Sequence, residues 1–258
     1  MRASARSCDV GEPVADRLLG GRLTLLQRPG GHRAGTDAVL LAAAADAPAD
    51  GHFVDVGSGV GSAGLMLARR CPGARGLLVE VDGATAALAR RNCVENGLAE
   101  RVEVVEADLF ARAADRPAAL APERAALVLT NPPFFAREVV RASPDADRAR
   151  AHVLGGQGHG DWLAACVALL APRGRFVTIH RPDALPELLA ACTGRLGALV
   201  LRPVLARPGG DAIRILLAGT KGSRAPLRLA PPFVLHGPDG AFTPEAEAVH
   251  RGEAAVTL

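Results

Sequence analysis

Short apolar segments alternate with segments of helical pattern from residue 52 onward, and this alternation constrains the fold more than any other feature of the chain. The expected strands cover residues 53–56, 77–81, 102–106, 126–130, 175–180, 198–205 and 212–218. The expected helices lie near residues 61–71, 83–97, 159–171 and 183–195. Most of the early strands are nearly continuous apolar runs, which is typical of strands buried on both faces. The pattern therefore predicts an α/β fold with a doubly wound, mostly parallel sheet.

The connection between the last two expected strands is a short turn around Pro208–Asp211. Two parallel strands need a crossover of a dozen or more residues, so this link predicts an antiparallel pair at one end of the sheet. The expected sheet thus has seven strands, of which the last is antiparallel.

The segments on either side of this alternating region have weaker patterns. Residues 18–27 form two short apolar runs about Gly20 and Gly21, which predicts a β-hairpin. Thr36 and Asp37 precede an Ala- and Leu-rich segment to about Ala45, which predicts a helix with a polar cap. We expect a single domain over residues 1–258, with the hairpin and helix in 1–48, the core in 49–222 and a proline-rich, unassigned tail in 223–258.

The composition indicates the cellular compartment of the protein more than its activity. The net charge of +3 does not indicate nucleic-acid binding by itself, because binding depends on where charge lies. Five cysteines without a C-x-x-C pair or zinc spacing predict reduced thiols in a cytoplasmic protein without a metal site. The apolar stretches are far shorter than the roughly 20 residues of a membrane span, and no signal peptide is recognisable. The oligomeric state stays open.

Residues 53–61 read F-V-D-V-G-S-G-V-G, an apolar strand that enters a glycine-rich turn at the start of a helix. Glycine lets the backbone turn tightly and approach a ligand where a Cβ atom would clash. We therefore expect Gly57, Gly59 and Gly61 to contact a nucleotide-type cofactor. Asp55 is expected to hold this loop and to approach the amino group of a methionine moiety.

Acidic residues follow the next two strands. Glu80 ends the second strand of the core, where a carboxylate can accept hydrogen bonds from both ribose hydroxyls. Asp82 is the alternative for this role. Asp108 follows the third strand and is expected to accept a hydrogen bond from the adenine N6 amino group, with Leu109 packed on the ring. A dinucleotide cofactor would also use Glu80, but Asp55 and Asp108 favour an adenosine ligand with a methionine moiety.

Residues 130–135 read T-N-P-P-F-F after the fourth strand. An –NH2 group conjugated with a ring or a carbonyl is a poor nucleophile, because its lone pair is delocalised. It improves when the Asn131 side-chain oxygen and the Pro132 carbonyl accept its two hydrogens, and consecutive prolines fix the direction of that carbonyl. Phe134 offers a face on which an extruded base can stack. Positioning for in-line attack on a sulfonium methyl donor then needs no metal.

The motifs D-V-G-S-G-V-G, V-E-V-D, A-D-L and N-P-P-F, in this order, resemble those of class I S-adenosylmethionine-dependent methyltransferases that act on –NH2 groups. Three further segments, at 25–41, 175–182 and 236–245, are similar to segments of the bacterial tRNA adenosine-37 N6-methyltransferases, which modify a valine tRNA. The resemblance spans roughly residues 16–245. It implies a Rossmann-like sheet, S-adenosylmethionine as the cofactor and tRNA as the partner.

The same resemblance implies contacts that the residues alone do not. Arg33, Gly35, Thr36 and Asp37 would lie over the methionine end of the donor, and Asn131 would contact the donor as well as the acceptor. The stretch after N-P-P-F carries several basic residues but also acidic ones, so its own composition leaves open an RNA-contacting loop and a solvated surface loop. Its candidate phosphate and RNA contacts, taken together with Arg33, are Arg137, Arg141, Arg148, Arg150, His152 and His159.

Other functions stay open at this point. A protein glutamine N5-methyltransferase acts on the same kind of –NH2 group, but its usual helical domain does not fit into the 54 residues before Asp55. An rRNA guanine N2-methyltransferase would usually carry a second, degenerate domain. A non-catalytic RNA-binding scaffold is disfavoured because Asp55, Glu80, Asp108 and Asn131 are all present. A dinucleotide oxidoreductase is disfavoured by N-P-P-F.

Overall fold

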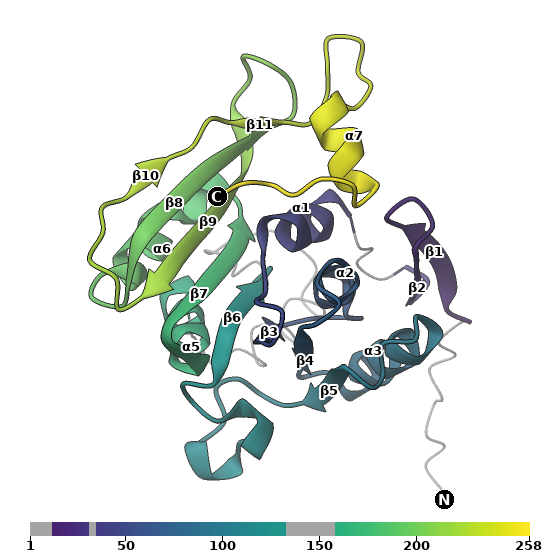
Figure 1. Cartoon of the computed structure of the whole chain (residues 1–258), viewed down its shortest axis with the longest axis vertical. Coiled ribbons are helices and arrows are strands. Elements are labelled where there is room, and N and C mark those ends of the chain that lie inside the picture. Colours follow the sequence, from purple (N-terminus) through teal and green to yellow (C-terminus); the bar gives the residue numbers. More distant parts are fainter. Residues whose placement is uncertain (1–11, 31–34, 133–157) are drawn as a thin grey trace, which may run out of the picture.

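The computed structural model describes residues 12–30, 35–132 and 158–258, and its main element is a nine-stranded sheet (Figure 1). Seven strands form most of this sheet, in the order β8-β9-β7-β6-β3-β4-β5. They are β3 (His52–Val56), β4 (Arg75–Glu80), β5 (Val102–Glu106), β6 (Ala125–Thr130), β7 (Leu170–His180), β8 (Leu196–Leu205) and β9 (Ala212–Lys221). Two strands of two residues each, β10 (Arg228–Leu229) and β11 (Phe233–Val234), pair with β8.

The pairing directions agree with the sequence pattern. Strands β5, β4, β3, β6 and β7 run parallel to one another, whereas β9 is antiparallel to both β7 and β8. The predicted seven-stranded, doubly wound sheet with an antiparallel last strand is confirmed. The two short strands come from the tail, which the sequence left unassigned.

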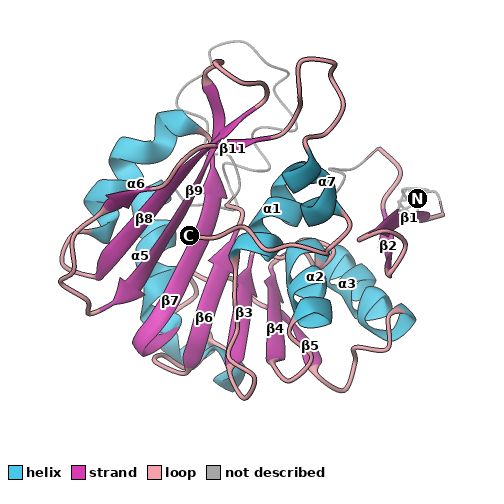
Figure 2. Ribbon diagram, turned by 45° about the horizontal axis from the view of Figure 1, so that its top comes forward, coloured by secondary structure: helices cyan, strands magenta, loops and turns pink. Residues whose placement is uncertain are grey.

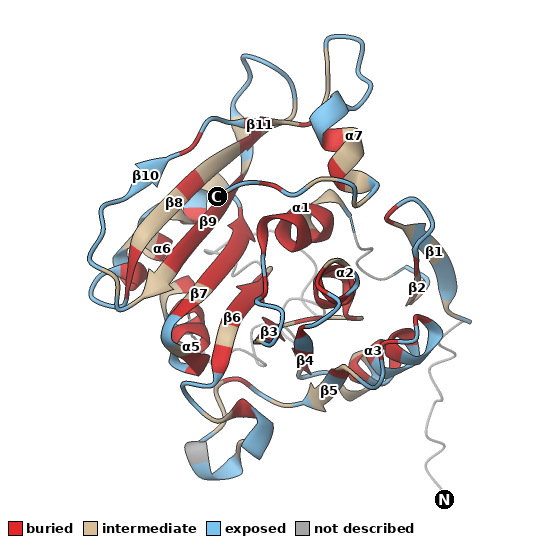
Figure 3. Ribbon diagram, viewed as in Figure 1, coloured by how far each residue is buried: buried red, intermediate tan, exposed pale blue. Residues whose placement is uncertain are grey.

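Helices cover both faces of the sheet (Figure 2). The first face carries α1 (Thr36–Ala44), α2 (Ser62–Arg70) and α3 (Gly83–Glu95), and the second carries α5 (His159–Leu169) and α6 (Leu185–Cys192). Short 3-10 helices occupy Ala113–Asp115, Ala118–Leu120 and Pro182–Ala184. Two separate apolar clusters fill the spaces between the sheet and its two helical layers, and buried residues follow the strands and inner helix faces (Figure 3).

The start of α1 differs from the prediction. The polar cap expected at Thr36 and Asp37 is wrong, because Gly35 is the N-cap residue and the helix has no side-chain cap bond. Thr36 and Asp37 are instead its first two helical residues. The Asp37 carboxylate accepts a hydrogen bond from Arg214 Nε at 2.8 Å, and a negative charge in the first turn also suits the helix dipole.

The tail packs against the core. Its helix α7 (Pro244–His250) lies beside α1, and the Val256 N–H donates to the Ala43 carbonyl at 2.9 Å. The Thr243 hydroxyl caps α7 by accepting from the Ala246 N–H at 3.1 Å.

No helix in the described residues is long and apolar enough to cross a membrane. The four cysteines in the described part of the chain are free and buried.

The expected hairpin is present as β1 (Val14–Leu18) and β2 (Leu23–Gln27), with Gly20 and Gly21 at positive φ in the turn. Its first strand begins four residues earlier than expected. Asn92 of α3 and Asn96, the C-cap residue of that helix, bind the backbone of β2 as a neighbouring strand would. Asn92 accepts from the Leu26 N–H and donates to the Leu26 carbonyl, at 2.8 and 3.0 Å. Asn96 does the same for Thr24, at 2.9 and 2.7 Å.

Asn92→Ala should lower the free energy of unfolding by about 2–3 kcal/mol, because it leaves several backbone groups unpaired in a buried setting. The Asn92 Nδ2 atom also donates to the Val60 carbonyl at 2.9 Å, so the loss reaches the glycine loop. Arg91→Ala, at an exposed position of the same helix, should change stability by no more than about 0.5 kcal/mol. Urea unfolding measures the free energy of unfolding of both variants. Equal losses in Asn92→Ala and Arg91→Ala would show that the amide pairing contributes nothing to stability.

Candidate active site

The expected site residues follow the carboxyl ends of four adjacent strands. In the order β6-β3-β4-β5, these ends lead to Asn131, to the glycine loop, to Glu80 and to Asp108. Because the four strands are parallel, their carboxyl ends meet at one edge of the sheet. Open α/β sheets bind their ligands at this edge. The structure therefore brings together residues that lie up to 76 positions apart in the sequence, from Asp55 to Asn131.

Asp55 is buried in β3 and holds the first turn of α2. Its Oδ2 atom accepts from the Gly64 N–H at 2.8 Å. A Cβ atom on Gly64 would lie 2.3 Å from Leu78 Cδ2, so only glycine lets the helix come this close to β3 and β4. The pKa of Asp55 is raised to about 7 because burial outweighs the hydrogen bond from the Gly64 N–H, which lowers it, and the nearby charge of Glu80 adds to the rise.

This raised pKa makes a prediction for stability. The unfolded chain loses the Asp55 proton near the ordinary value of 3.8, but the folded protein keeps it up to about pH 7. The folded state therefore loses stability as pH rises from about 4 to about 7, by on the order of 4 kcal/mol at most. Asp55→Asn removes the titrating group, so its stability relative to wild type should increase between pH 5 and pH 8. Unfolding curves for both proteins that stay parallel over this range would contradict the burial effect.

The glycine loop depends on three glycines at positive φ, namely Gly57 (+68°), Gly59 (+57°) and Gly61 (+90°). Residues with a side chain rarely adopt this conformation. A Cβ atom on Gly59 would have no neighbour within 4 Å, so this side of the loop is open. The loop is fixed to β4 because the Ser58 N–H donates to the Val79 carbonyl at 2.9 Å.

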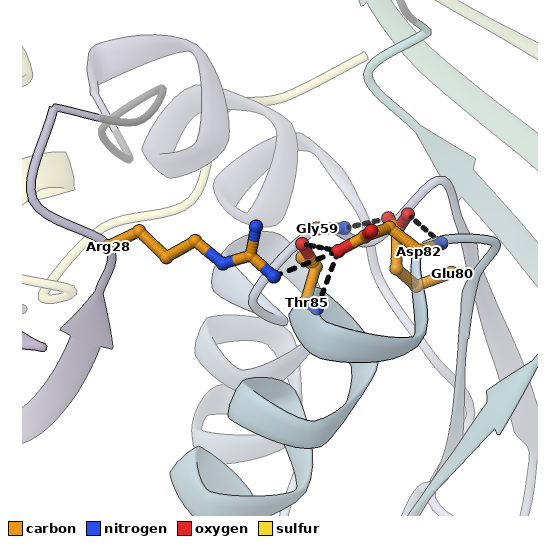
Figure 4. A network of polar contacts seen from close by, with 5 residues as sticks. All are labelled: Arg28, Gly59, Glu80, Asp82 and Thr85. Carbon is orange, nitrogen blue, oxygen red and sulfur yellow. Dashed lines mark hydrogen bonds and ion pairs between the residues drawn. The ribbon is translucent and has the colours of Figure 1, made fainter. Parts of the chain in front are cut away.

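Glu80, the last residue of β4, connects the glycine loop to the start of α3 (Figure 4). Its Oε2 atom accepts from the Gly59 N–H at 2.9 Å, and its Oε1 atom accepts from the Asp82 N–H at 2.9 Å. A carboxylate has about four acceptor positions, so these two bonds orient the group and leave capacity for further donors.

Asp82, the alternative to Glu80, has a different setting (Figure 4). It is the N-cap of α3, and its Oδ1 atom accepts from the Thr85 N–H at 2.7 Å and the Thr85 hydroxyl at 2.5 Å. The same oxygen accepts from Arg28 Nη2 at 3.0 Å. The hydrogen bond from the Thr85 side chain, together with Arg28, lowers the pKa of Asp82. This side chain therefore serves helix capping and the attachment of the segment that follows β2.

Asp108 and Leu109 follow β5. The exposed Asp108 carboxylate accepts from the Phe110 N–H at 2.9 Å, and the Ala107 N–H ties this segment to β4 by donating to the Glu80 carbonyl at 3.0 Å. Leu109 is only 4% exposed and packs in the apolar cluster beneath the sheet. In this conformation its side chain presents little surface to a ligand.

Thr130 ends β6 and leads directly into Asn131 and Pro132. Thr130 is fully buried, and its hydroxyl donates to the Val56 carbonyl at 2.7 Å. Asn131 is partly exposed at the sheet edge, whereas Pro132 is buried. Several expected site residues lie outside the described residues: Arg33, Phe134, Arg137, Arg141, Arg148, Arg150 and His152.

Two groups of expected residues lie on other parts of this edge. Gly35, Thr36 and Asp37 line a cavity of about 300 Å³ together with residues of β8 and β9. His159, the first residue of α5, is buried with its ring 4.5 Å from that of His180. Burial, and secondarily the charge of His159, lowers the pKa of His180 to about 4, so that ring is neutral near pH 7.

A larger cavity, of about 490 Å³, lies at the opposite edge of the sheet, where its lining includes His52, Arg75 and Arg124. It contains none of the expected site residues, so we place the site at the carboxyl edge, where the motifs converge. Among the described residues, no three His, Cys, Asp or Glu side chains are grouped so that they could hold a metal ion.

The sequence interpretation missed Trp162, the only tryptophan of the chain. This buried residue of α5 donates from Nε1 to the Thr130 hydroxyl at 3.0 Å. A Cβ atom on Gly57 would lie 3.1 Å from its Cζ2 atom, and its ring meets that of Phe110 edge-on at 5.8 Å. A single tryptophan in an aromatic-poor chain, near the expected substrate loop, was the signal available.

Comparison with known proteins gives consistent matches. The model of the methyltransferase small domain matches residues 32–145. The tRNA1(Val) (adenine(37)-N6)-methyltransferase of Porphyromonas gingivalis is 32% identical over 222 residues, which cover 83% of this chain and 85% of that protein. The protein of the same name from Aeromonas hydrophila is 33% identical over 213 residues, with 82% and 85% covered.

Solved structures agree on the fold. A predicted O-methyltransferase from Agrobacterium tumefaciens, 33% identical, superposes with a TM-score of 0.72 over 86% of this chain and 99% of that chain. A SAM-dependent O-methyltransferase from Thermotoga maritima, 17% identical, has a TM-score of 0.53 over 78% of this chain and 74% of that one. The names of these proteins differ from those of the sequence relatives in the acceptor atom, oxygen in place of nitrogen.

Proposed function

Because this chain belongs to the family of the tRNA1(Val) (adenine(37)-N6)-methyltransferases, we propose that it methylates the N6 amino group of an adenine in tRNA. The methyl donor is S-adenosylmethionine. The observation that carries the proposal is the position of Asn131 and Pro132, which follow the end of β6 beside the end of β3 and its glycine loop. An amide oxygen and a backbone carbonyl are two acceptors, which suits an –NH2 group with its two hydrogens better than a hydroxyl with one.

The residues at the strand ends fit the donor. The open side of Gly59 leaves room where a Cβ atom would stand, and the Glu80 carboxylate beside it can accept from ribose hydroxyls. The exposed Asp108 carboxylate can accept from the adenine amino group. Asp55 holds the loop, and the opposite charge of the donor's amino group would favour its ionised form. When bound, S-adenosylmethionine supplies an activated methyl group.

On the acceptor side, the Asn131 amide oxygen and the Pro132 carbonyl accept hydrogen bonds from the two amino hydrogens of the base. This pulls the nitrogen toward a tetrahedral shape and makes its lone pair available. Phe134 is proposed as the surface on which the base stacks, and Arg33, Gly35, Thr36 and Asp37 as contacts of the donor's methionine end. The proposed donor contacts at the ends of β3, β4 and β5 lie at the same sheet edge as the proposed acceptor contacts after β6, which supports the proposal.

We also propose that residues 1–258 act as one domain in the cytoplasm, where tRNA is modified. The pairing of β10 and β11 with β8, and the bond between Val256 and Ala43, support the inclusion of the tail.

The proposal is tested with purified protein, S-adenosylmethionine and three acceptors: unmodified tRNA, ribosomal RNA and a release factor. N6-methyladenosine should form in the tRNA alone. Methyl transfer to the release factor would instead support the glutamine alternative, and N2-methylguanosine in ribosomal RNA would support the guanine alternative.

A further inference from the structure

The proposed reaction needs three loops that come from three different strands, and direct strand pairing joins only two of these strands. The last pair between β3 and β6 joins Val56 to Thr130, directly before Gly57 and Asn131. The Asp108 segment follows β5, which is separated from β6 by β3 and β4. A group that contacts all three loops would therefore set the donor position relative to the acceptor.

Trp162 contacts all three. Its Nε1 atom donates to the Thr130 hydroxyl at 3.0 Å, and its ring edge lies against the backbone of Gly57. Its ring also packs edge-on against Phe110, two residues after Asp108. Trp162 itself lies on α5, on the second face of the sheet, so it supports the loops from beneath.

The Thr130 hydroxyl extends this contact into a chain of two hydrogen bonds. It accepts from Trp162 and donates to the Val56 carbonyl at 2.7 Å, so its single hydrogen has one defined direction. Both bonds are buried, where an unpaired partner is costly and the geometry is therefore well determined. Thr130, in the middle of this chain, is followed by Asn131, the proposed acceptor contact, and Val56, at its end, is followed by Gly57, which begins the donor loop.

We propose that Trp162, acting through Thr130, is a positioning residue that sets the alignment of the methyl donor with the acceptor nitrogen. This inference rests on the proposed function. Methyl transfer requires in-line geometry, and a displacement of about 1 Å can lower the rate about 100-fold. Trp162 lies on α5 beneath the loops and is only 7% exposed, so we expect its effect to fall on kcat while the affinity for either reactant stays the same.

Trp162→Phe removes the N–H group together with the far ring edge, Cζ2 and Cη2, that faces Gly57, whereas Thr130→Val removes only the hydroxyl at nearly constant volume. Each should lower kcat on the order of 10-fold, with the KM for tRNA and the Kd for S-adenosylmethionine within about 3-fold of wild type. Thr130→Ser keeps the hydroxyl, so its kcat should stay close to that of wild type. The double variant should be no slower than the slower single variant, because both changes break the same chain.

A matched control separates positioning from stability. Phe233→Leu alters a buried side chain that packs on Arg202, and its strand β11 pairs with β8, which β9 and β7 separate from β6. It should lower Tm without changing kcat. If Trp162→Phe and Thr130→Val behave like this control, or if the donor Kd weakens in proportion to kcat, the positioning role is wrong. Wild-type protein that transfers no methyl group to tRNA would contradict the proposed function and this inference together, whereas fully active variants contradict only the inference.

Discussion

Asn131→Ala should lower kcat for tRNA methylation by about 100- to 1000-fold and leave the Kd for S-adenosylmethionine within a few-fold of wild type. The size follows from the loss of one oriented polar group at the reacting atom, which costs about this much in other enzymes. We expect the change in kcat and not in the donor Kd because of where these residues lie. Asn131 follows β6, whereas the proposed ribose and adenine contacts lie at the ends of β4 and β5.

The control for this variant is Asn131→Asp, which keeps an acceptor oxygen at the same position. It should retain far more activity than Asn131→Ala, although its charge changes the site. Single-turnover rates with saturating donor separate chemistry from product release. An Asn131→Ala protein that methylates tRNA within about 3-fold of the wild-type rate would remove Asn131 from the mechanism.

Glu80→Ala should weaken binding of S-adenosylmethionine by about 100-fold or more. A hydrogen bond to a charged group contributes roughly 1.5–3 kcal/mol, and the proposed role gives Glu80 two such bonds to the ribose. The variant also releases the Gly59 N–H, which Glu80 holds in the present structure. Calorimetry of the purified protein measures the change directly.

Asp82→Asn is the matched control, because it removes the same charge two residues away. Its carboxylate caps α3 and pairs with Arg28, so the variant should lose stability while its donor Kd changes only a few-fold. If Asp82→Asn weakens binding as much as Glu80→Ala, the ribose contact belongs to Asp82 or to both. If neither variant changes the Kd, the acidic residues after β4 have no part in donor binding.

The strands of the core could be predicted because burial on both faces leaves almost continuous apolar runs. Their ends were less certain where packing decides them. β7 begins at Leu170 and not at the expected residue 175, because Leu170 pairs with Ala125 across an irregularity in the ladder. β4 ends at Glu80, which leaves Val81 47% exposed although it continues the apolar run.

The site was predicted where a local motif names the residue and was missed where contacts connect distant segments. Asp55, Glu80 and Asp108 could be predicted as site residues because each lies close to the end of a recognisable strand. Asp82 is followed three residues later by Thr85, so its capping role had a local signal. Trp162 had only its rarity as a signal, because its contacts with Gly57, Phe110 and Thr130 exist only once β3, β5, β6 and α5 have assembled. The cap expected at Thr36 failed because Gly35 takes that position.

Methylation of adenine N6 in tRNA by this protein can be tested by mass spectrometry of tRNA nucleosides from a strain that lacks it, complemented with wild type or with Asn131→Ala. We expect N6-methyladenosine to be lost from tRNA in the deletion, to return with the wild-type protein and not to return with Asn131→Ala. An unchanged amount of N6-methyladenosine in the deletion strain, or full restoration by Asn131→Ala, would contradict it.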